Sequence, residues 1–455
     1  MGKSPIFAAG SNKSVKMRNE KNMIDIHTLY QTFLASTGVT TDSRRCPAGS
    51  LFIALRGETF NGNAFAARAL EAGCSYALVD DPAYAPAGDP RYLVTDNGLL
   101  TLQALARHHR RQLGTRILGI TGTNGKTTTK ELVACVLSQR YRTLATEGNL
   151  NNSIGVPLTL LRLRSEHELA VVEMGASHPG DIRELADIAE PDCGLITNVG
   201  KAHLEGFGSL EGVIRTKGEL FDNLRRREGA FVFLHRDNPY LVRMGEGLKQ
   251  VTYGCDEACD IQGRLAACSP CLSFDWRCGA TGSWHHVSTR LIGSYNLPNA
   301  LAAAAVGCHF GVEEALISQA LGEYVPRNSR SQLMRTADNT LIIDAYNANP
   351  TSMRAAIENF AQMEAPHKML ILGDMLELGK ESLSEHQEVV DYLSGQGFSD
   401  VILVGGQFAA TRHACPTYPD APSLIEALKA RKPVGKTILI KGSNGVKLSA
   451  VAAYL

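Results

Sequence analysis

Short apolar runs alternate with segments of helical periodicity from Arg116 to the end of the chain. In the middle of the chain the runs are RILGI, LAVVEM, CGLIT and AFVFL, and later ones are TLIID, KMLILGD, DVILVGG and TILIKGS. Runs of this length between helical segments predict parallel strands with helices on both faces of a sheet. Gly, Asn, Asp or Glu repeatedly follows a run. The pattern therefore predicts an α/β fold with its binding residues at the carboxyl ends of the strands.

Interruptions of this pattern predict three domains, as the length of 455 residues also suggests. Residues 1–22 are polar and basic without periodicity, and we expect a disordered extension there. Residues 23–113 carry the runs SLFIAL, YALVD and RYLVT with helices between them, which predicts a smaller α/β domain. Pro326 and polar neighbours break the pattern between Tyr324 and Gln332. We therefore expect two separate sheets, in a central domain (114–325) and a C-terminal domain (326–455).

The charge balance restricts the class of partner. Lys+Arg and Asp+Glu both number 46, so the formal net charge is +0 and gives no general attraction for nucleic acid or an anionic membrane. No apolar run approaches the roughly 20 residues that span a bilayer, and the N-terminus lacks the apolar core of a signal peptide. We expect a cytoplasmic monomer without nucleic-acid partners or membrane insertion.

Eleven cysteines are scattered along the chain, which is typical of free thiols in a reducing compartment. Five of them cluster in one segment: Cys255, Cys259, Cys268, Cys271 and Cys278. The CSPC spacing is that of a zinc knuckle, but a second pair is missing. The pattern favours free thiols over a structural zinc.

The stretch GITGTNGKTTTKELVACVLSQRY predicts a strand, a tight glycine loop and a helix that together bind phosphate. Gly122 and Gly125 let the backbone turn and approach phosphate oxygens, Lys126 supplies a point charge, and the Thr127 hydroxyl can ligate Mg²⁺. Ile120 stands where the longer phosphate-loop motif has glycine. The loop predicts ATP binding, and we expect the ATP contacts here to be Gly122, Thr123, Asn124, Gly125, Lys126, Thr127 and Thr128.

Two further residues follow strands of the same predicted sheet. Glu173 ends the buried run LAVVEM, where an unpaired carboxylate is costly unless a cation neutralises it, so we expect a magnesium ligand. His203 follows CGLIT and is predicted to contact metal or phosphate. The alternatives are a salt-bridged carboxylate and a structural histidine.

Seven motifs then occur in the order seen in the Mur ligase family: GTNGKTT, TEGNLNNSIGVP, EMGASHPGDI, TNVGKAHLEGFGS, GSYNLPNALAA, DAYNANPTSM and LGDMLELG. The resemblance covers the chain from about Met23 to Leu455. It implies a small N-terminal α/β domain for a UDP-linked substrate, a central P-loop mononucleotide-binding α/β domain and a C-terminal Rossmann-like α/β domain. The last two motifs resemble the branch whose C-terminal domain takes an incoming dipeptide.

The resemblance also implies a reaction. ATP phosphorylates the terminal carboxylate of UDP-N-acetylmuramoyl-tripeptide, D-alanyl-D-alanine attacks the acyl phosphate, and ADP and phosphate leave. Two Mg²⁺ ions are expected, one near Thr127 and Glu173 and one reaching His203. Lys217, in IRTKGELF, matches the family lysine that CO₂ carbamylates into a metal ligand, and the alternative is a surface lysine on a helix. Lys126, Glu173, His203 and Lys217 are thus the expected catalytic residues.

Other matching positions receive roles by resemblance alone. The nucleotide would contact Asn296 and Asn299 at the adenine, Arg330 at the phosphates and Asp344 at the ribose. Ser43 and Arg44 would contact the diphosphate or sugar of the UDP-linked substrate, and Asn149 and Asn152 would orient phosphate or the acyl group. The face that takes the dipeptide would include Tyr346, Asn347, Asn349, Asp374, Glu377 and His386, and the same domain carries Lys441 and Ser443. The chain departs from the family at Asn61, Asn63, Ser329 and Asn444.

Two alternatives stay open. One is another amide-forming relative, either a diamino-acid-adding or a folylpolyglutamate-like ligase, although no DNPR motif occurs in the third domain. The other is a nucleotide-dependent switch without ligase chemistry, which would leave Glu173, His203, Lys217 and Asp344 without a shared purpose. The sequence does not specify the third residue of the peptide substrate.

Overall fold

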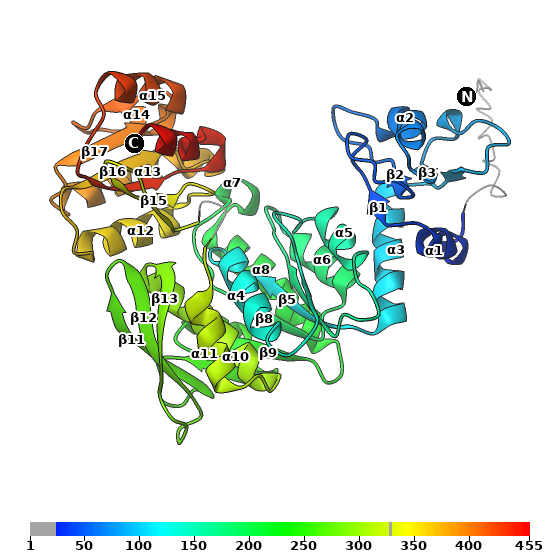
Figure 1. Ribbon diagram of the computed structural model, residues 1–455, viewed down its shortest axis with the longest axis horizontal. Coiled ribbons are helices and arrows are strands. Elements are labelled where there is room, and N and C mark those ends of the chain that lie inside the picture. The colour runs from blue at the N-terminus through cyan, green and yellow to red at the C-terminus, as the bar shows by residue number, and fades with distance from the viewer. Residues whose placement is uncertain (1–23, 327–329) are drawn as a thin grey trace, which may run out of the picture. The chain divides into compact units, whose positions relative to one another are not determined.

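The computed structural model describes residues 24–326 and 330–455, which form two compact units (Figure 1). The first unit ends at Leu105 and the second runs from Ala106 to Leu455. The predicted N-terminal extension, and Ser329 within the predicted interdomain break, lie outside the described residues.

The first unit is built on a four-stranded parallel sheet in the order β1-β2-β3-β4. Its strands are β1 (Val39–Thr40), β2 (Leu51–Ile53), β3 (Tyr76–Val79) and β4 (Tyr92–Val94), and its helices are α1 (Ile26–Ala35) and α2 (Ala66–Glu71). The three predicted runs form β2, β3 and β4, because their apolar side chains pack against α2 in a buried cluster. Helix α3 (Gly98–Leu113) begins here and continues into the second unit.

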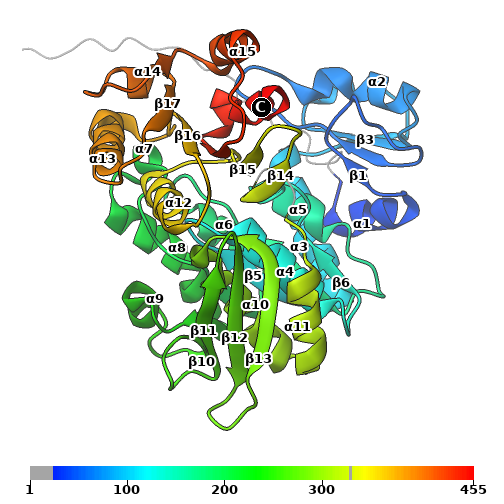
Figure 2. The same cartoon turned by 60° about the vertical axis from the view of Figure 1, so that its left-hand side comes forward.

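A nine-stranded sheet forms one half of the second unit, in the order β13-β12-β11-β10-β9-β8-β5-β7-β6. Its strands are β5 (Arg116–Thr121), β6 (Thr143–Ala145), β7 (Leu169–Glu173), β8 (Cys193–Ile196), β9 (Phe231–His235), β10 (Lys249–Gly254), β11 (Ile261–Cys268), β12 (Cys271–Cys278) and β13 (His285–Ile292). Strands β5 to β11 pair in parallel, and β12 and β13 extend the sheet through antiparallel pairs with β11 and with each other (Figure 2). In β12 the side chains of Leu272, Phe274 and Trp276 alternate into the core.

Helices cover both faces of this sheet because the residues of β5 alternate between two apolar layers. Leu118 and Ile120 join a buried cluster with α4 (Lys126–Leu137) and α10 (Leu297–His309), whereas Gly119 faces Leu220 of α8 on the other side. The remaining helices are α5 (Gly155–Leu160), α6 (Asp181–Ala189), α7 (Leu204–Phe207), α8 (Leu210–Arg225), α9 (Pro239–Met244) and α11 (Glu314–Glu323).

The C-terminal sheet has six strands in the order β14-β15-β19-β16-β17-β18, parallel except for β14 at the edge. The strands are β14 (Gln332–Arg335), β15 (Thr340–Asp344), β16 (Lys368–Gly373), β17 (Asp400–Val404), β18 (Thr417–Tyr418) and β19 (Thr437–Lys441). The helices are α12 (Pro350–Gln362), α13 (Ser382–Ser394), α14 (Gly406–Ala409) and α15 (Ala421–Ala430). One buried cluster lies under α12 and α13, and another under α15.

Three sheets among the described residues confirm the predicted α/β fold class and the expectation of separate central and C-terminal sheets. Strand β5 lies between β8 and β7, so the chain order reverses at the predicted phosphate loop. Such a switch point opens a crevice at the carboxyl ends of the strands. Within the described residues, no helix combines the length and apolar character needed to cross a membrane.

Candidate functional site

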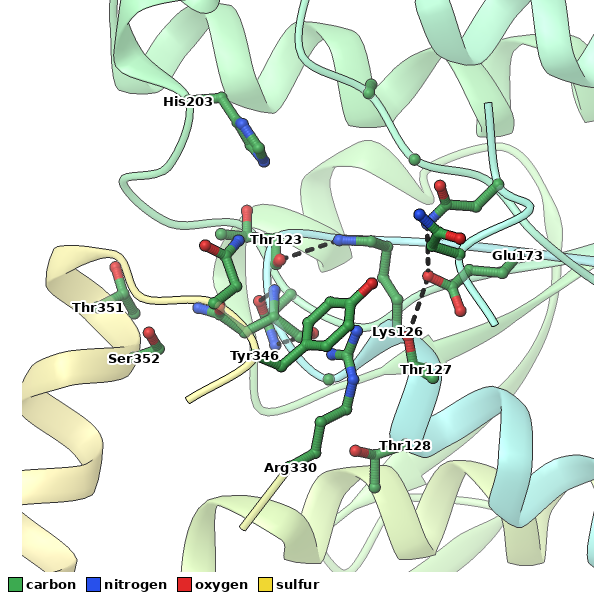
Figure 3. Close-up of a pocket in the computed structure, with 18 of the residues that line it drawn as sticks. Thr123, Lys126, Thr127, Thr128, Glu173, His203, Arg330, Tyr346, Thr351 and Ser352 are labelled. Atoms are coloured by element: carbon green, nitrogen blue, oxygen red, sulfur yellow. Dashed lines mark hydrogen bonds between the residues drawn. The ribbon is translucent and has the colours of Figure 1, made fainter. Parts of the chain in front are cut away.

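A cavity of about 780 Å³ opens at the carboxyl ends of β5 and β7 and is closed on the far side by residues of the C-terminal sheet domain (Figure 3). Most of the predicted nucleotide residues line it, including Thr123 to Thr128 of the loop, Asn296, Asn299, Arg330 and Asp344. The cavity is also lined by Asn149, Asn152, Glu173, His203, Tyr346, Asn347, Glu377 and Lys441. The fold thus gathers side chains from positions more than 300 residues apart.

The phosphate loop has the backbone that its glycines predict. Gly122 has φ +145°, and a Cβ there would lie 1.9 Å from the Thr197 hydroxyl; Gly125 has φ +77°. Lys126 begins α4 and turns back over the loop, where its Nζ donates to the carbonyls of Gly122 (2.8 Å) and Thr123 (3.1 Å). A phosphate group would find this ammonium and the start of α4 on the same side of the loop.

Thr197 and Asn198, which directly follow β8, fix the shape of this loop. The sequence analysis did not single out either residue. The Asn198 Oδ1 accepts the N–H of Asn124 at 2.9 Å. The Asn124 carbonyl in turn accepts from the Thr197 hydroxyl (2.6 Å) and from Asn198 Nδ2 (3.1 Å). The loop backbone is therefore held in place without a ligand, which is the preorganisation that phosphate binding and electrostatic catalysis require.

Glu173 provides a buried carboxylate at the end of β7. Its side chain accepts from the Thr127 hydroxyl (3.1 Å) and from Asn151 Nδ2 (2.8 Å), both on Oε1, while the buried Oε2 has no partner among the described residues. A buried carboxylate oxygen without a partner is costly in the absence of a cation. The hydroxyl and carboxylate oxygens are also the donors that Mg²⁺ prefers, so the residues present fit the ion.

His203 reaches the cavity from the loop before α7, in a left-handed backbone conformation with φ +50°. Its Nδ1 lies 2.6 Å from Oε2 of Glu377, which follows β16 in the C-terminal domain. This contact lowers the pKa of the Glu377 carboxyl against the opposing effect of burial. The pair connects the two sheet domains at the rim of the cavity.

Lys217 is not a surface residue. It lies on α8 with 2% of its area exposed, and its Nζ is 5.3 Å from the centre of the Phe207 ring, which also packs against His203. Burial lowers the pKa of Lys217 well below its usual range, and the charge of Lys126 lowers it further. Lys217 does not line the cavity itself. A lysine of low pKa is more readily found as the neutral amine, which is the form that reacts with electrophiles.

Arg330 enters the cavity from the C-terminal side. Its guanidinium lies over the Tyr346 ring, 3.9 Å from the centroid, and its buried Nε has no partner in the described part of the chain. Burial lowers the pKa of Lys126 to about 8, and the nearby Arg330 charge adds to this effect while Glu173 opposes it. Two cations held close together in a buried site predict an anionic ligand.

The remaining predicted nucleotide residues make protein contacts. Asp344, at the end of β15, pairs with Lys441 Nζ at 2.5 Å and accepts the N–H of Ser331 at 3.3 Å. Asn299 accepts from the Thr129 hydroxyl (3.1 Å) and donates to Asn296 (2.9 Å), and a Cβ at Gly125 would lie 2.7 Å from its Oδ1. These two asparagines therefore support the phosphate loop from behind as well as lining the cavity.

The asparagines in the loop before α5 make contacts that the sequence analysis did not predict. Asn152 Oδ1 accepts the N–H groups of Ile154 (3.1 Å) and Gly155 (2.8 Å), so part of its capacity serves the local turn. Asn151, which the sequence reasoning passed over, is the residue that reaches Glu173. Asn149 lines the cavity.

Two residues expected on the dipeptide face are not there. His386 is 0% exposed and its Nε2 accepts the N–H of Met375 at 2.9 Å. Asp374 accepts the N–H groups of Gln407 and Phe408, both at 2.9 Å. Neither lines the cavity, so the prediction of substrate contact is wrong for this pair. They stabilise the turn that leads to Glu377, which does line the cavity.

In the first unit, Ser43 and Arg44 lie in the loop after β1. Arg44 has an 82% exposed side chain and pairs with Asp42 through Nε (2.9 Å) and a second nitrogen (3.0 Å). The hydrogen bonds from Arg44 lower the pKa of Asp42 to about 2. The eleven cysteines, including the five of the cluster, form no disulfide bonds, and the described residues contain no group of three or more His, Cys, Asp or Glu arranged to hold a metal ion.

Three family models match this chain. The Mur ligase family catalytic domain matches residues 36–110, the Mur ligase middle domain residues 120–307, and the Mur ligase glutamate ligase domain residues 329–444. The UDP-N-acetylmuramoyl-tripeptide–D-alanyl-D-alanine ligase of Bacillus subtilis is 36% identical over 429 residues, which cover 92% of this chain and 93% of that protein.

Solved structures agree. MurF from Acinetobacter baumannii matches with a TM-score of 0.82 and 28% identity over 94% of this chain and 97% of that one. MurF from Thermotoga maritima in complex with ADP matches with a TM-score of 0.81 and 25% identity over 93% and 97%. The family models and the Bacillus subtilis relative match most of the length of the chain, and the phosphate loop and the cavity are consistent with these matches. The chain therefore belongs to the Mur ligase family.

Proposed function

We propose that this protein joins D-alanyl-D-alanine to UDP-N-acetylmuramoyl-tripeptide with ATP, giving the pentapeptide precursor of peptidoglycan, ADP and phosphate. The names of its relatives support this substrate pair. The observation that carries the proposal is the cavity in which Lys126, Glu173 and Arg330 lie together beside the C-terminal domain. We further propose that the enzyme is a cytoplasmic monomer.

The nucleotide would lie along the phosphate loop. Lys126 and Arg330 face the same space from opposite domains, so both can contact the γ-phosphate that is transferred. Bringing a carboxylate to a triphosphate sets like charges together, and fixed cations offset this repulsion most strongly where water is excluded. Asn296 and Asn299 would border the adenine, and Asp344 the ribose.

Thr127 and Glu173 would hold Mg²⁺, and His203 a second ion. When bound, magnesium neutralises the phosphate charge that develops during transfer. Within this chain, Asn151 orients the Glu173 carboxylate, and the unpartnered Oε2 is the oxygen left for a cation. Lys217 in its carbamylated form would add a second anionic oxygen group. Its burial and low pKa support this, because CO₂ reacts with a neutral amine.

The substrates would enter from different domains. We assign residues 23–113, with Ser43 and Arg44, to the UDP-linked substrate, residues 114–325 to ATP, and residues 326–455 to the dipeptide. Asn149 and Asn152 would orient the acyl group, and Tyr346 and Asn347 lie on the C-terminal side of the cavity, where the dipeptide amine would attack.

A nucleotide switch without ligase chemistry is the weaker alternative. Phosphate binding alone would not account for the buried Lys217 beside Phe207, nor for the His203 and Glu377 contact between domains. Solved structures of a diaminopimelate-adding ligase and of a folylpolyglutamate synthase match this chain at 18% and 15% identity, and likeness at that level supports the fold alone.

Oxygen transfer tests the proposed chemistry. The terminal carboxylate of UDP-N-acetylmuramoyl-tripeptide is labelled with ¹⁸O, and the enzyme is supplied with ATP, Mg²⁺ and D-alanyl-D-alanine. An acyl phosphate requires one ¹⁸O to appear in the released phosphate, and the UDP product to gain the mass of the dipeptide residue. Unlabelled phosphate, or phosphate release without the heavier product, would contradict the proposal.

A further inference from the structure

Asn349 lies where the C-terminal sheet domain meets the phosphate loop, and its position differs from the substrate contact that the sequence predicts. It is 5% exposed and does not line the cavity, whereas Asn347 before it and Thr351 and Ser352 after it do. A side chain that is buried between the two domains can act on the reaction only through its neighbours.

The neighbour of Asn349 across the domain boundary is Asn124 of the phosphate loop. Asn349 Nδ2 donates to Asn124 Oδ1 at 2.8 Å, and Asn124 Nδ2 approaches Asn349 Oδ1 at 3.4 Å. Asn349 is also the N-cap of α12, because its Oδ1 accepts the N–H of Ser352 at 2.9 Å while its own N–H donates to the Ser352 hydroxyl at 3.1 Å. These contacts fix the direction of the amide.

Asn124, the partner of Asn349, is also held in place. The backbone of Asn124 is occupied by Thr197 and Asn198, so only its side chain is directed at the C-terminal domain. A second contact runs beside the first, since a Cβ on Gly200 would lie 2.8 Å from the Thr351 hydroxyl, and Gly200 N–H donates to Thr123 Oγ1 at 3.0 Å. The first turn of α12 therefore packs directly against the loops that surround the phosphate site.

We propose that the Asn124–Asn349 amide pair is a positioning contact that couples the phosphate loop to the C-terminal domain during ligation. Tyr346 and Arg330, which both line the cavity, form a cation–π pair, and Tyr346 is only three residues from Asn349. Fixing Asn349 to the loop therefore helps to fix this pair in the cavity where the nucleotide would bind. Because transfer is sensitive to placement on the scale of 1 Å, a lost contact here lowers the rate without removing a catalytic group.

The first test is a double-mutant cycle on ligation, and it rests on the proposed function. Asn349→Ser keeps an oxygen that can cap α12 but cannot reach Asn124, and Asn124→Ala removes the partner and leaves the cap intact. Each variant should lower kcat about tenfold at saturating substrate, or ~1.4 kcal/mol, and the double variant should fall no further. The control is Arg354→Ala, an exposed residue of α12 paired with Glu358, whose effect should add to that of Asn124→Ala.

A second measurement requires only nucleotide binding, so it also separates the inference from the proposed ligase activity. Hydrogen exchange of the first turn of α12 is followed with and without ADP and Mg²⁺. ADP should protect this segment in the wild type and in Arg354→Ala, but not in Asn124→Ala at saturating ADP. Equal protection in Asn124→Ala, or kcat losses in the cycle that simply multiply, would overturn the inference.

Discussion

Nucleotide binding should take up protons near pH 8, and Lys126 is the group responsible. Burial and the Arg330 charge lower its pKa from 10.5 to about 8 in the ligand-free protein. A bound phosphate group supplies the opposite charge that favours the ammonium form and raises the pKa again. The ligand-free protein therefore carries a partly neutral Lys126 that becomes fully charged in the complex.

The size of the effect follows from that pKa. About half of Lys126 is neutral at pH 8, roughly a tenth at pH 7 and about nine tenths at pH 9. Because each neutral side chain takes up one proton when the nucleotide binds, the same fractions give the number of protons taken up per nucleotide. Nucleotide affinity should accordingly fall about tenfold between pH 7 and pH 9. In the ligand-free protein, the same burial destabilises the fold below pH 8, and this cost disappears as the pH rises through 8 towards 10.5.

Isothermal titration calorimetry measures the uptake. A non-hydrolysable ATP analogue with Mg²⁺ is titrated at pH 8 in buffers of low and high ionisation enthalpy, and the slope of observed heat against that enthalpy gives the proton count. Lys126→Arg is the matched control, because guanidinium stays charged and should show no uptake. Arg330→Ala should reduce the uptake by raising the pKa of Lys126. A slope near zero in the wild type, or an equal slope in Lys126→Arg, would refute the reasoning.

Three further predictions concern single residues. Lys217→Ala should be nearly inactive and regain activity with added short carboxylic acids that replace the carbamate, so near-normal activity without them would contradict carbamylation. Glu173→Gln should lower kcat at least a hundredfold, or ~3 kcal/mol, without lowering the melting temperature, and activity within tenfold of wild type would rule out a metal ligand. Asp374→Ala loses two acceptors for backbone N–H groups, so we expect it to destabilise the fold by ~1–3 kcal/mol with kcat within twofold of wild type; a large fall in kcat at full stability would restore a direct role.

Periodicity was sufficient to predict most of the parallel strands, including those that lead into the site, and the phosphate loop, because both depend on local patterns. The strand run LAVVEM and the loop GTNGKTT each determine their own conformation through burial or backbone geometry. The sequence could not show that Lys217 is buried, since α8 packs its face on α6 and β5, and that contact is made by segments distant in the chain.

The remaining differences between the predicted and the observed contacts occur where several nearby residues of similar type could make the same contact. NLNN offers three asparagines, and only the folded loop turns Asn151 towards Glu173. Asp374 follows a strand as a binding residue would, but it instead accepts the first N–H groups of α14. Asn349 shares a motif with Tyr346 and Asn347, yet the start of α12 directs it to Asn124. Loop direction, which periodicity does not encode, separates these cases.

Acceptor choice tests the central claim most directly. Phosphate release is measured with ATP, Mg²⁺ and UDP-N-acetylmuramoyl-tripeptide, and D-alanyl-D-alanine, a diamino acid and glutamate are compared as acceptors. We expect rapid release with D-alanyl-D-alanine, release near the background rate with the other two, and no release in Lys126→Ala. Equal or faster release with the diamino acid or glutamate, or release that needs no acceptor at all, would contradict the proposed function.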